Sequence, residues 1–182
     1  MNKLKCNKGF TLIELLVVIA ILAVMALIAL PRISGFINSQ RRESSLFQAY
    51  ITAVTDDAFI SGKTNYLCIH LNFPGDNNKD PFPGMPAEKN SLSVFNLSGN
   101  SFEINSRKVL SLRSFSSSFI FDSVILEGGK TIEYGNVLIP FYSDGSSEYF
   151  VLKVNTEGNN IYFRKEKNGK SPALIDEIQV IK

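Results

Sequence analysis

The chain has 182 residues, a length that suits one domain with an appendage. It contains 19 basic and 17 acidic residues, but three of the basic ones, Lys3, Lys5 and Lys8, lie within its first nine positions. From position 10 onward the balance is therefore 16 basic against 17 acidic residues, which excludes the global basic field typical of nucleic-acid-binding proteins.

A long apolar run near the N-terminus is the strongest signal. The 21 residues from Phe10 to Leu30 contain a single charged side chain, Glu14, and Pro31 follows directly. As an α-helix this run is about 31 Å long, which matches the roughly 30 Å hydrocarbon core of a bilayer. The lysines before it favour a cytoplasmic N-terminus, so the residues after Pro31 are expected on the periplasmic side of the inner membrane.

A cleaved secretory signal and a plain signal-anchor are two alternative interpretations of this run. A secretory signal has an apolar stretch of about 7–15 residues followed by a small-residue cleavage site, whereas this run is longer and ends in Ala29-Leu30-Pro31-Arg32. A signal-anchor leaves Glu14 unexplained, because a carboxylate in an apolar span costs at least ~2.5 kcal/mol and indicates a functional site.

The N-terminal sequence KGFTLIELLVVIAIL resembles the N-terminal motif of type IV pilins and type II secretion pseudopilins. That motif is a basic leader ending in glycine, followed by Phe, Thr, Leu, an apolar residue and Glu. The resemblance implies that a prepilin peptidase cuts between Gly9 and Phe10, and that the new amino group of Phe10 is then methylated. Residues 1–9 would be the prepilin leader peptide and residues 10–30 a transmembrane and assembly helix.

Glu14 is expected to direct assembly. Cleavage would create an ammonium at Phe10, one helical turn from Glu14, in an apolar medium where neither charge is stable without a partner. An incoming subunit that places its Phe10 ammonium beside the Glu14 carboxylate of a neighbour sets the axial register of the packed helices. The partners implied are other pilin or pseudopilin subunits, membrane lipid and an inner-membrane assembly platform.

Residues 31–62 are expected to continue as an exported amphipathic helix. Pro31 should kink it, because proline supplies no backbone donor. The acidic pair Asp56-Asp57 is expected to be solvated. Apolar residues recur with a period close to 3.6 and form one face that needs a sheet to cover it. These residues are Ile33, Ile37, Phe47, Ile51, Val54 and Ala58.

Residues 63–182 are predicted to form a globular β-sandwich, which gives the whole chain an α+β, pilin-like fold. The expected strands are short runs rich in β-branched and aromatic residues, separated by Gly, Asn, Asp and Ser. Asp144-Gly145 and Glu157-Gly158-Asn159-Asn160 predict hairpins, and Phe73–Pro86 predicts an irregular loop. The expected strands are Thr64–Phe73, Ser91–Leu97, Phe102–Ile104, Val109–Leu112, Ser118–Leu126, Thr131–Tyr142, Ser147–Val154, Ile161–Lys165 and Ser171–Ile181.

The predicted hairpin Val137–Val154, VLIPFYSDGSSEYFVLKV, resembles a strand, Asp-Gly turn and strand of the GspH/FimT group of minor pseudopilins and minor pilins. This resemblance implies a β-sandwich behind the helix. The function it implies is that of a structural subunit at or near the tip of the periplasmic pseudopilus of a type II secretion system, which helps initiate filament assembly for protein export. The alternative is a minor type IV pilin that acts in pilus assembly or in DNA binding and uptake.

Catalytic, cofactor and metal sites are not expected. His70 is the single histidine, and Cys68 is the single cysteine beyond the leader, so the processed chain has no internal disulfide. One Cys and one His make at most half a zinc site, so Cys68 is interpreted as a buried apolar residue. Asp76–Asp80 resembles the start of a calcium loop, but Pro81 and Ala87 stand where that loop needs Gly and Glu. No nucleophile has an evident base, so the chain is not expected to be an enzyme.

DNA-binding members of this group are expected to carry a basic C-terminal segment. Here the basic residues Arg164, Lys165, Lys167 and Lys170 form a cluster that Glu166 interrupts. Residues 171–182 contain Asp176 and Glu177 and no arginine. The cluster is interpreted as a solvated hairpin end, and nucleic acid is not an expected partner.

Overall fold

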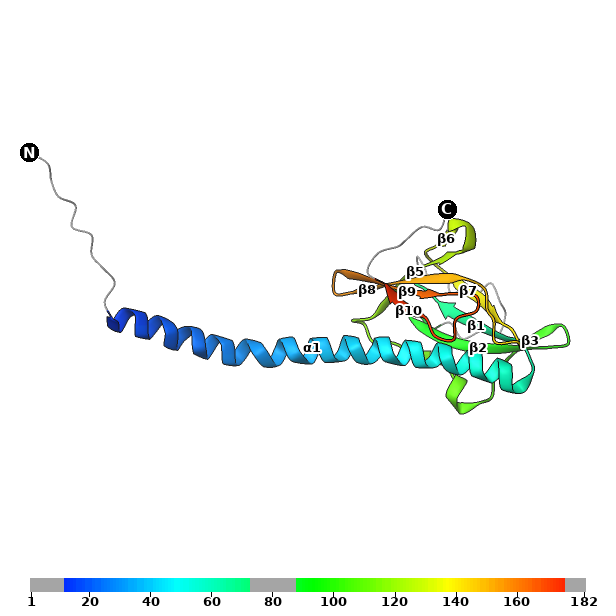
Figure 1. Cartoon of the computed structure of the whole chain (residues 1–182), viewed down its shortest axis with the longest axis horizontal. Coiled ribbons are helices and arrows are strands. Elements are labelled where there is room, and N and C mark those ends of the chain that lie inside the picture. Colours follow the sequence, from blue (N-terminus) through cyan, green and yellow to red (C-terminus); the bar gives the residue numbers. More distant parts are fainter. Residues whose placement is uncertain (1–11, 73–87, 176–182) are drawn as a thin grey trace, which may run out of the picture. The chain divides into compact units, whose positions relative to one another are not determined.

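The chain divides into two compact units, Met1–Ser39 and Gln40–Lys182. The computed structural model describes residues 12–72 and 88–175, and for residues 26–39 it describes the backbone alone. Helix α1 (Leu12–Ser61) supplies the described part of the first unit and continues into the second (Figure 1).

Helix α1 covers most of the predicted transmembrane and amphipathic segments. Pro31 lies inside it, and the backbone is helical on both sides of the proline. The kink expected at Pro31 stays a prediction. The helix ends at Ser61, where Gly62 adopts a φ of +64°, the left-handed conformation that commonly follows the last residue of a helix.

In its described residues, the second unit contains two antiparallel sheets of five strands each, which confirms the α+β fold predicted from the sequence. Sheet A has the order β3-β2-β1-β7, with β4 also paired to β2. Sheet B has the order β10-β9-β8-β5-β6. The bounds in sheet A are β1 (Asn65–His70), β2 (Ser91–Ser98), β3 (Ser101–Ile104), β4 (Arg113–Ser114) and β7 (Asn136–Phe141). Those in sheet B are β5 (Ile120–Leu126), β6 (Thr131–Ile132), β8 (Phe150–Thr156), β9 (Asn159–Lys165) and β10 (Ala173–Ile175).

The core of the second unit lies between the buried face of α1 and the inner faces of the two sheets. The predicted stripe is confirmed at Phe47, Ile51, Val54 and Ala58, each with an exposed fraction of 0%. The ring of Phe47 lies 4.7 Å from that of Phe163 on β9. Sheet A contributes apolar side chains such as Leu67 and Ile69, and sheet B contributes Leu152 and Phe163.

Two of the predicted strands are wrong in detail. Val109–Leu112 does not form a strand, because residues Lys108–Leu110 form a 3-10 helix, η1, that buries Leu110. The predicted strand Thr131–Tyr142 divides into β6 and β7. Gly135 lies between them with a φ of +91°, a conformation that an extended strand does not contain. A second short 3-10 helix, η2 (Glu127–Gly129), precedes β6.

The Asp144-Gly145 turn forms, but it does not join two strands of one hairpin. Gly145 adopts a φ of +85° and the Ser146 amide donates to Asp144 Oδ1 at 2.9 Å, as expected for a tight turn. However, β7 pairs within sheet A and β8 within sheet B. The two flanking segments are linked only next to the turn, by the bridge Phe141↔Ser147 and by backbone hydrogen bonds from Tyr142 to Ser146 and from Glu148 to Pro140. The predicted β-hairpin is therefore a crossing between the two sheets.

The second hairpin is confirmed. Strands β8 and β9 pair from Phe150↔Lys165 to Thr156↔Asn159, so Glu157 and Gly158 form the two-residue turn between them. Cys68 is also buried as predicted, with an exposed fraction of 0%.

Candidate assembly helix and its seat in the globular unit

The N-terminal part of α1 exposes apolar side chains over its whole described surface. Glu14 lies in the first turn of α1. All side chains from Leu12 to Met25 are exposed, with exposed fractions of 83% for Leu12 and 63% for Met25. A soluble domain seldom shows so large an apolar surface, which therefore marks an interaction site for protein or lipid. Gly9 and Phe10, the predicted processing residues, lie outside the described residues.

Among the residues that the structure describes, no helix combines the length and the hydropathy that crossing a membrane requires.

The second half of α1 packs on the globular unit between two sets of polar contacts, one on each side of the helix. We call these two sets of contacts the rims. On one side, three neutral side chains contact the segment that leads into β10. Gln48 Nε2 donates to the Pro172 carbonyl at 3.3 Å. Thr55 Oγ1, which donates to the Ile51 carbonyl at 3.1 Å, lies 3.5 Å from the Lys170 carbonyl oxygen. Between them, the hydroxyls of Thr52 and Ser171 are 2.8 Å apart.

The connection between β3 and β4 forms the other rim. The Tyr50 hydroxyl donates to the carbonyl of Leu110 at 3.0 Å and to that of Ser111 at 3.3 Å. Burial raises the pKa of Tyr50, so this hydroxyl keeps its proton and remains a donor.

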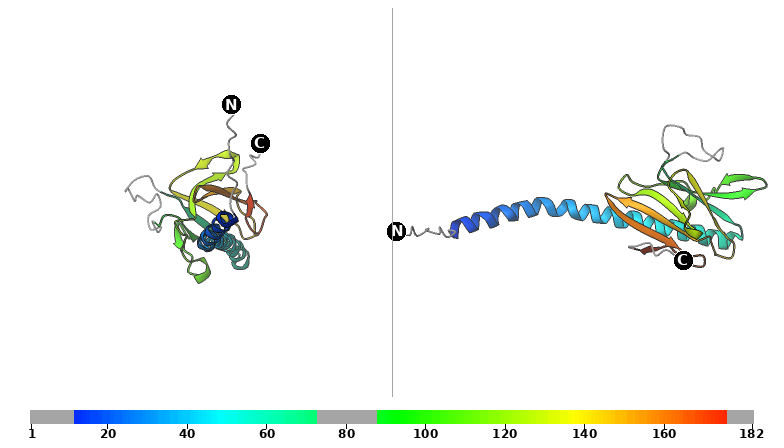
Figure 2. Two further views of the ribbon diagram at one scale, coloured as in Figure 1. Left: turned by 90° about the vertical axis from the view of Figure 1, so that its left-hand side faces the viewer. Right: turned by 90° about the horizontal axis from the view of Figure 1, so that it is seen from above.

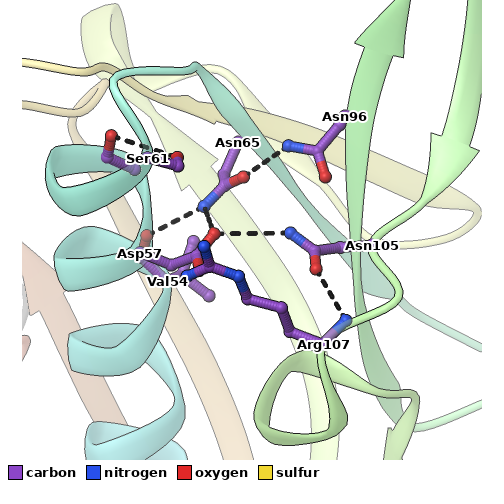
Figure 3. Close-up of polar contacts among 8 residues, drawn as sticks. Val54, Asp57, Ser61, Asn65, Asn96, Asn105 and Arg107 are labelled. Atoms are coloured by element: carbon purple, nitrogen blue, oxygen red, sulfur yellow. Dashed lines mark hydrogen bonds and ion pairs between the residues drawn. The ribbon is translucent and has the colours of Figure 1, made fainter.

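Asp57 is the centre of the second rim, where the sequence predicted a solvated side chain (Figure 3). This expectation is wrong for Asp57, which has an exposed fraction of 7%, although Asp56 is exposed. The Asp57 Oδ2 atom accepts from Asn65 Nδ2 at 2.9 Å and from Asn105 Nδ2 at 3.4 Å. The Arg107 guanidinium donates to Asp57 Oδ1 and forms an ion pair with it.

Further hydrogen bonds orient these donors. Asn65 Nδ2 also donates to the Val54 carbonyl of α1 at 3.2 Å, and its Oδ1 accepts from Asn96 Nδ2 at 2.6 Å. Asn105 Oδ1 accepts from the Arg107 amide at 3.0 Å. The carboxylate of Asp57 is thus linked to β1, β2 and the connection after β3. The neighbouring residue on α1, Asp56, lies on a different face of the helix and is exposed to solvent.

His70 occupies a polar network across three adjacent strands of sheet A. Its Nδ1 lies 2.7 Å from Asn136 Oδ1, and its Nε2 lies 2.7 Å from Ser93 Oγ. Because the Asn136 oxygen is an acceptor, Nδ1 carries the proton and Nε2 accepts from Ser93. The sequence shows no evident base for a serine, whereas the fold places the His70 ring beside Ser93. However, His70 is 0% and Ser93 1% exposed, so the network satisfies polar groups within the sheet.

No group of three or more His, Cys, Asp or Glu side chains placed to hold a metal ion occurs in the described part of the chain. Cys68 Sγ lies 3.9 Å from His70 Nδ1 on the same face of β1. The calcium-like sequence Asp76–Asp80 lies outside the described residues.

Comparison with known proteins finds a sequence motif at the N-terminus and a similar fold over most of the chain. Residues 4–30 match the family model of the prokaryotic N-terminal methylation motif. The fold matches a structure of the minor pseudopilin EpsH from the type 2 secretion system of Vibrio cholerae with a TM-score of 0.52 and 12% identity, over 75% of this chain and 94% of EpsH. The chain combines a prepilin-type N-terminal methylation motif with a fold similar to that of a minor pseudopilin.

A second structure of EpsH gives a TM-score of 0.48 and 13% identity, over 80% of this chain and 96% of that one. No curated protein matches the sequence of this chain.

The basic cluster Arg164, Lys165, Lys167 and Lys170 is largely engaged in internal contacts. Arg164 Nε lies 2.9 Å from Glu166 Oε1, and Lys167 Nζ lies 2.8 Å from Glu127 Oε2. Lys165 is fully buried, where the sequence predicted a solvated hairpin end. The composition of the run RKEK does not show which lysine is buried. The one available signal is strand alternation, which places Lys165 on the same face of β9 as buried Phe163.

Proposed function

We propose that the chain is a minor pseudopilin of a type II secretion system, a structural subunit at or near the tip of the periplasmic pseudopilus that helps initiate its assembly. The prepilin-type motif at residues 4–30, followed by a minor-pseudopilin fold, is the observation that carries this proposal. The subunit is cut between Gly9 and Phe10 by prepilin peptidase and methylated at Phe10. It is anchored in the inner membrane by the apolar run Phe10–Leu30, with the globular unit in the periplasm.

The proposed work is architectural and not enzymatic. The exposed apolar surface of α1 packs against other pilin-like subunits, and Glu14 pairs with the Phe10 ammonium of a neighbour. Docking on an inner-membrane assembly platform precedes this packing. In a low-dielectric environment an unpaired charge is unfavourable, so the pair selects one axial register among many that apolar packing alone permits.

A minor type IV pilin in pilus assembly or DNA uptake is the alternative. The ion pairs of Arg164 and Lys167 and the burial of Lys165 argue against DNA binding, since each reduces the positive charge available to phosphate groups. Retention of the protein on DNA that falls steeply with added salt would favour the alternative.

Substitution of Glu14 tests the proposal in the native membrane. Glu14→Ala should still be cleaved and inserted, because loss of a charge from an apolar run makes insertion easier. Crosslinks to partner subunits should disappear, since leaving a neighbour's buried ammonium unpaired costs about 3–5 kcal/mol, against under about 1 kcal/mol for a surface contact. Glu14→Asp, which keeps the charge, is the matched control and should retain part of the crosslinking.

Mass spectrometry of the wild-type protein supplies the independent check on processing. The expected N-terminus is methylated Phe10, and replacing Gly9 with a bulky residue should leave the full-length precursor in the membrane. An N-terminus at Met1 or Asn2 in the wild type, or normal crosslinking and export with Glu14→Ala, would contradict the proposal.

A further inference from the structure

The two rims that flank the second half of α1 lie on opposite sides of the helix. At about 100° per residue, Tyr50 and Asp57 are two turns apart on one side of α1. Gln48, Thr52 and Thr55 lie on the other side, and the buried stripe from Phe47 to Ala58 runs between them. The view along the helix in the left panel of Figure 2 shows the η1 segment in green on one flank and β10 in red on the other.

The two rims differ in chemistry. The β10 rim consists of neutral hydroxyl and amide groups of α1, which contact two carbonyls and one hydroxyl of residues 170–172. The opposite rim contains a charged carboxylate with an exposed fraction of 7%, whose two oxygens receive donors from Asn65, Asn105 and Arg107. A buried ion with several oriented donors resists displacement more strongly than neutral partly exposed bonds do, because moving it leaves a desolvated charge behind.

We propose that Asp57 is the positioning residue that fixes the last turns of α1 to sheet A, so that axial movement of the helix is carried to the globular unit. We call Asp57 and its three donors, Asn65, Asn105 and Arg107, the hub. It joins the helix to β1 through Asn65 and to the connection after β3 through Asn105 and Arg107. Asn65 binds both the Asp57 carboxylate and the Val54 carbonyl, so β1 holds two points of the helix with one side chain. The part of this inference that concerns filament assembly rests on the proposed function.

Asp57→Asn is the sharpest change to this hub. The new side chain has nearly the same shape, but one of its two carboxylate oxygens becomes an NH2 donor. In one orientation this NH2 donor faces the Arg107 donor, and in the other it faces the donors of Asn65 and Asn105, so a donor is set against a donor in either orientation. Asp56→Asn is the matched control, because it removes the same charge from the neighbouring, exposed position of α1.

Hydrogen exchange of the full-length, membrane-embedded protein measures the coupling locally. With Asp57→Asn, backbone amides of residues 54–61 should exchange about a hundredfold faster, while those of β5, β8 and β9 stay within about threefold of the wild type. Asp56→Asn should leave both regions unchanged. A uniform increase over helix and sheets would assign Asp57 to general stability, and no increase would remove its role; either result overturns the inference.

Arg107 variants provide a second measurement that does not alter the helix. Arg107→Gln should reproduce the local increase in exchange at residues 54–61, and Arg107→Lys should restore part of the protection, because it keeps the charge but not the planar fork. In the same membranes, Asp57→Asn should retain crosslinks made through the N-terminal part of α1 and reduce export to below about a tenth of wild type.

Crosslinking, hydrogen exchange and export together distinguish a failure of the proposed function from a failure of the proposed role of Asp57. If the wild type makes no crosslinks to pilin-like partners, the proposed function fails, while the exchange result still decides whether Asp57 fixes the helix. If the helix loosens but export stays at the wild-type level, the mechanical role of the hub is rejected.

Discussion

Lys165 is a buried lysine at the end of β9. Its Nζ donates to Ser147 Oγ at 2.8 Å and to the Glu166 carbonyl at 3.0 Å, and it lies 5.4 Å from the centre of the Phe141 ring. These contacts join β9 of sheet B to the segment that follows β7 of sheet A. Burial disfavours the charged ammonium and lowers the pKa of Lys165 to about 8.

This pKa predicts that stability rises with pH above about 8. Between about 8 and the ordinary lysine value of 10.5, the unfolded chain keeps a proton that the folded chain has lost, so raising the pH favours folding. The contribution of this residue over the window is on the order of 3 kcal/mol. Denaturant unfolding at a series of pH values checks it, with Lys165→Met as the comparison. The unfolding free energy of the wild type minus that of Lys165→Met should rise with pH between about 8 and 10.5. A pH-independent difference would contradict the prediction.

At the scale of elements, the β8–β9 turn shows how local chemistry determines structure. Glu157 adopts a φ of +48° and Gly158 a φ of +91°, and positive φ at both positions is the signature of a type I′ turn. Glycine tolerates this conformation without strain, whereas glutamate does not, and asparagine is the usual residue at the first position. The turn therefore stores a small strain at Glu157.

Two substitutions in this turn should have opposite signs. Glu157→Asn should stabilise the protein by about 0.5–1 kcal/mol, since asparagine adopts left-handed backbone angles more readily. Gly158→Ala should destabilise it by about 1–2 kcal/mol, because a Cβ is disfavoured there even though no atom lies within 4 Å of its position. Gly169→Ala, at a glycine whose φ is outside the left-handed range, should have a smaller effect. Equal losses for Gly158→Ala and Gly169→Ala in thermal unfolding would reject this explanation.

Sequence patterns predicted the elements whose signals are local. The period of 3.6 identified the buried face of α1 at Phe47 and Ile51, and the Glu157-Gly158 pair identified a hairpin. Pairing between strands is not local, so the crossing of β7 and β8 into different sheets was not predictable from the Asp144-Gly145 turn. The N-terminal methylation motif at residues 4–30 was readable because it is contiguous. Asp57 was not, because its donors lie 8, 48 and 50 positions away in the chain.

At the scale of the whole molecule, the chain consists of two units with different surfaces. The described side chains of the first unit are exposed and almost all apolar, and such a surface needs lipid or other helices. The second unit, Gln40–Lys182, contains its own core of buried residues from α1 and both sheets. The two units, both of which contain part of α1, therefore differ in the surroundings that their surfaces favour.

A fragment that begins at Phe36 should consequently fold without the apolar segment. It retains the whole buried stripe from Phe47 to Ala58, so we expect a soluble monomer with a cooperative thermal transition and a circular dichroism spectrum of mixed helix and dominant strand. A fragment that begins at Ile51 is the matched control. It lacks Phe47, which is 0% exposed and lies 6.2 Å from Phe121 and 4.7 Å from Phe163. Loss of one such aromatic side chain costs about 3–5 kcal/mol, a large part of the 5–15 kcal/mol that typically stabilises a domain.

The shorter fragment also lacks Tyr50, whose hydroxyl binds the carbonyls of the η1 segment, and Gln48, which binds the β10 rim. It therefore loses contacts on both rims as well as in the core, and it should show no cooperative transition. Analytical ultracentrifugation and thermal melts of the two fragments measure these outcomes side by side. A predominantly helical spectrum or an oligomer for the fragment from Phe36 would contradict the division into two units, because the globular part would then depend on the apolar segment. A cooperative transition in the fragment from Ile51 would show instead that the sheets hold the core without the first buried turns of α1.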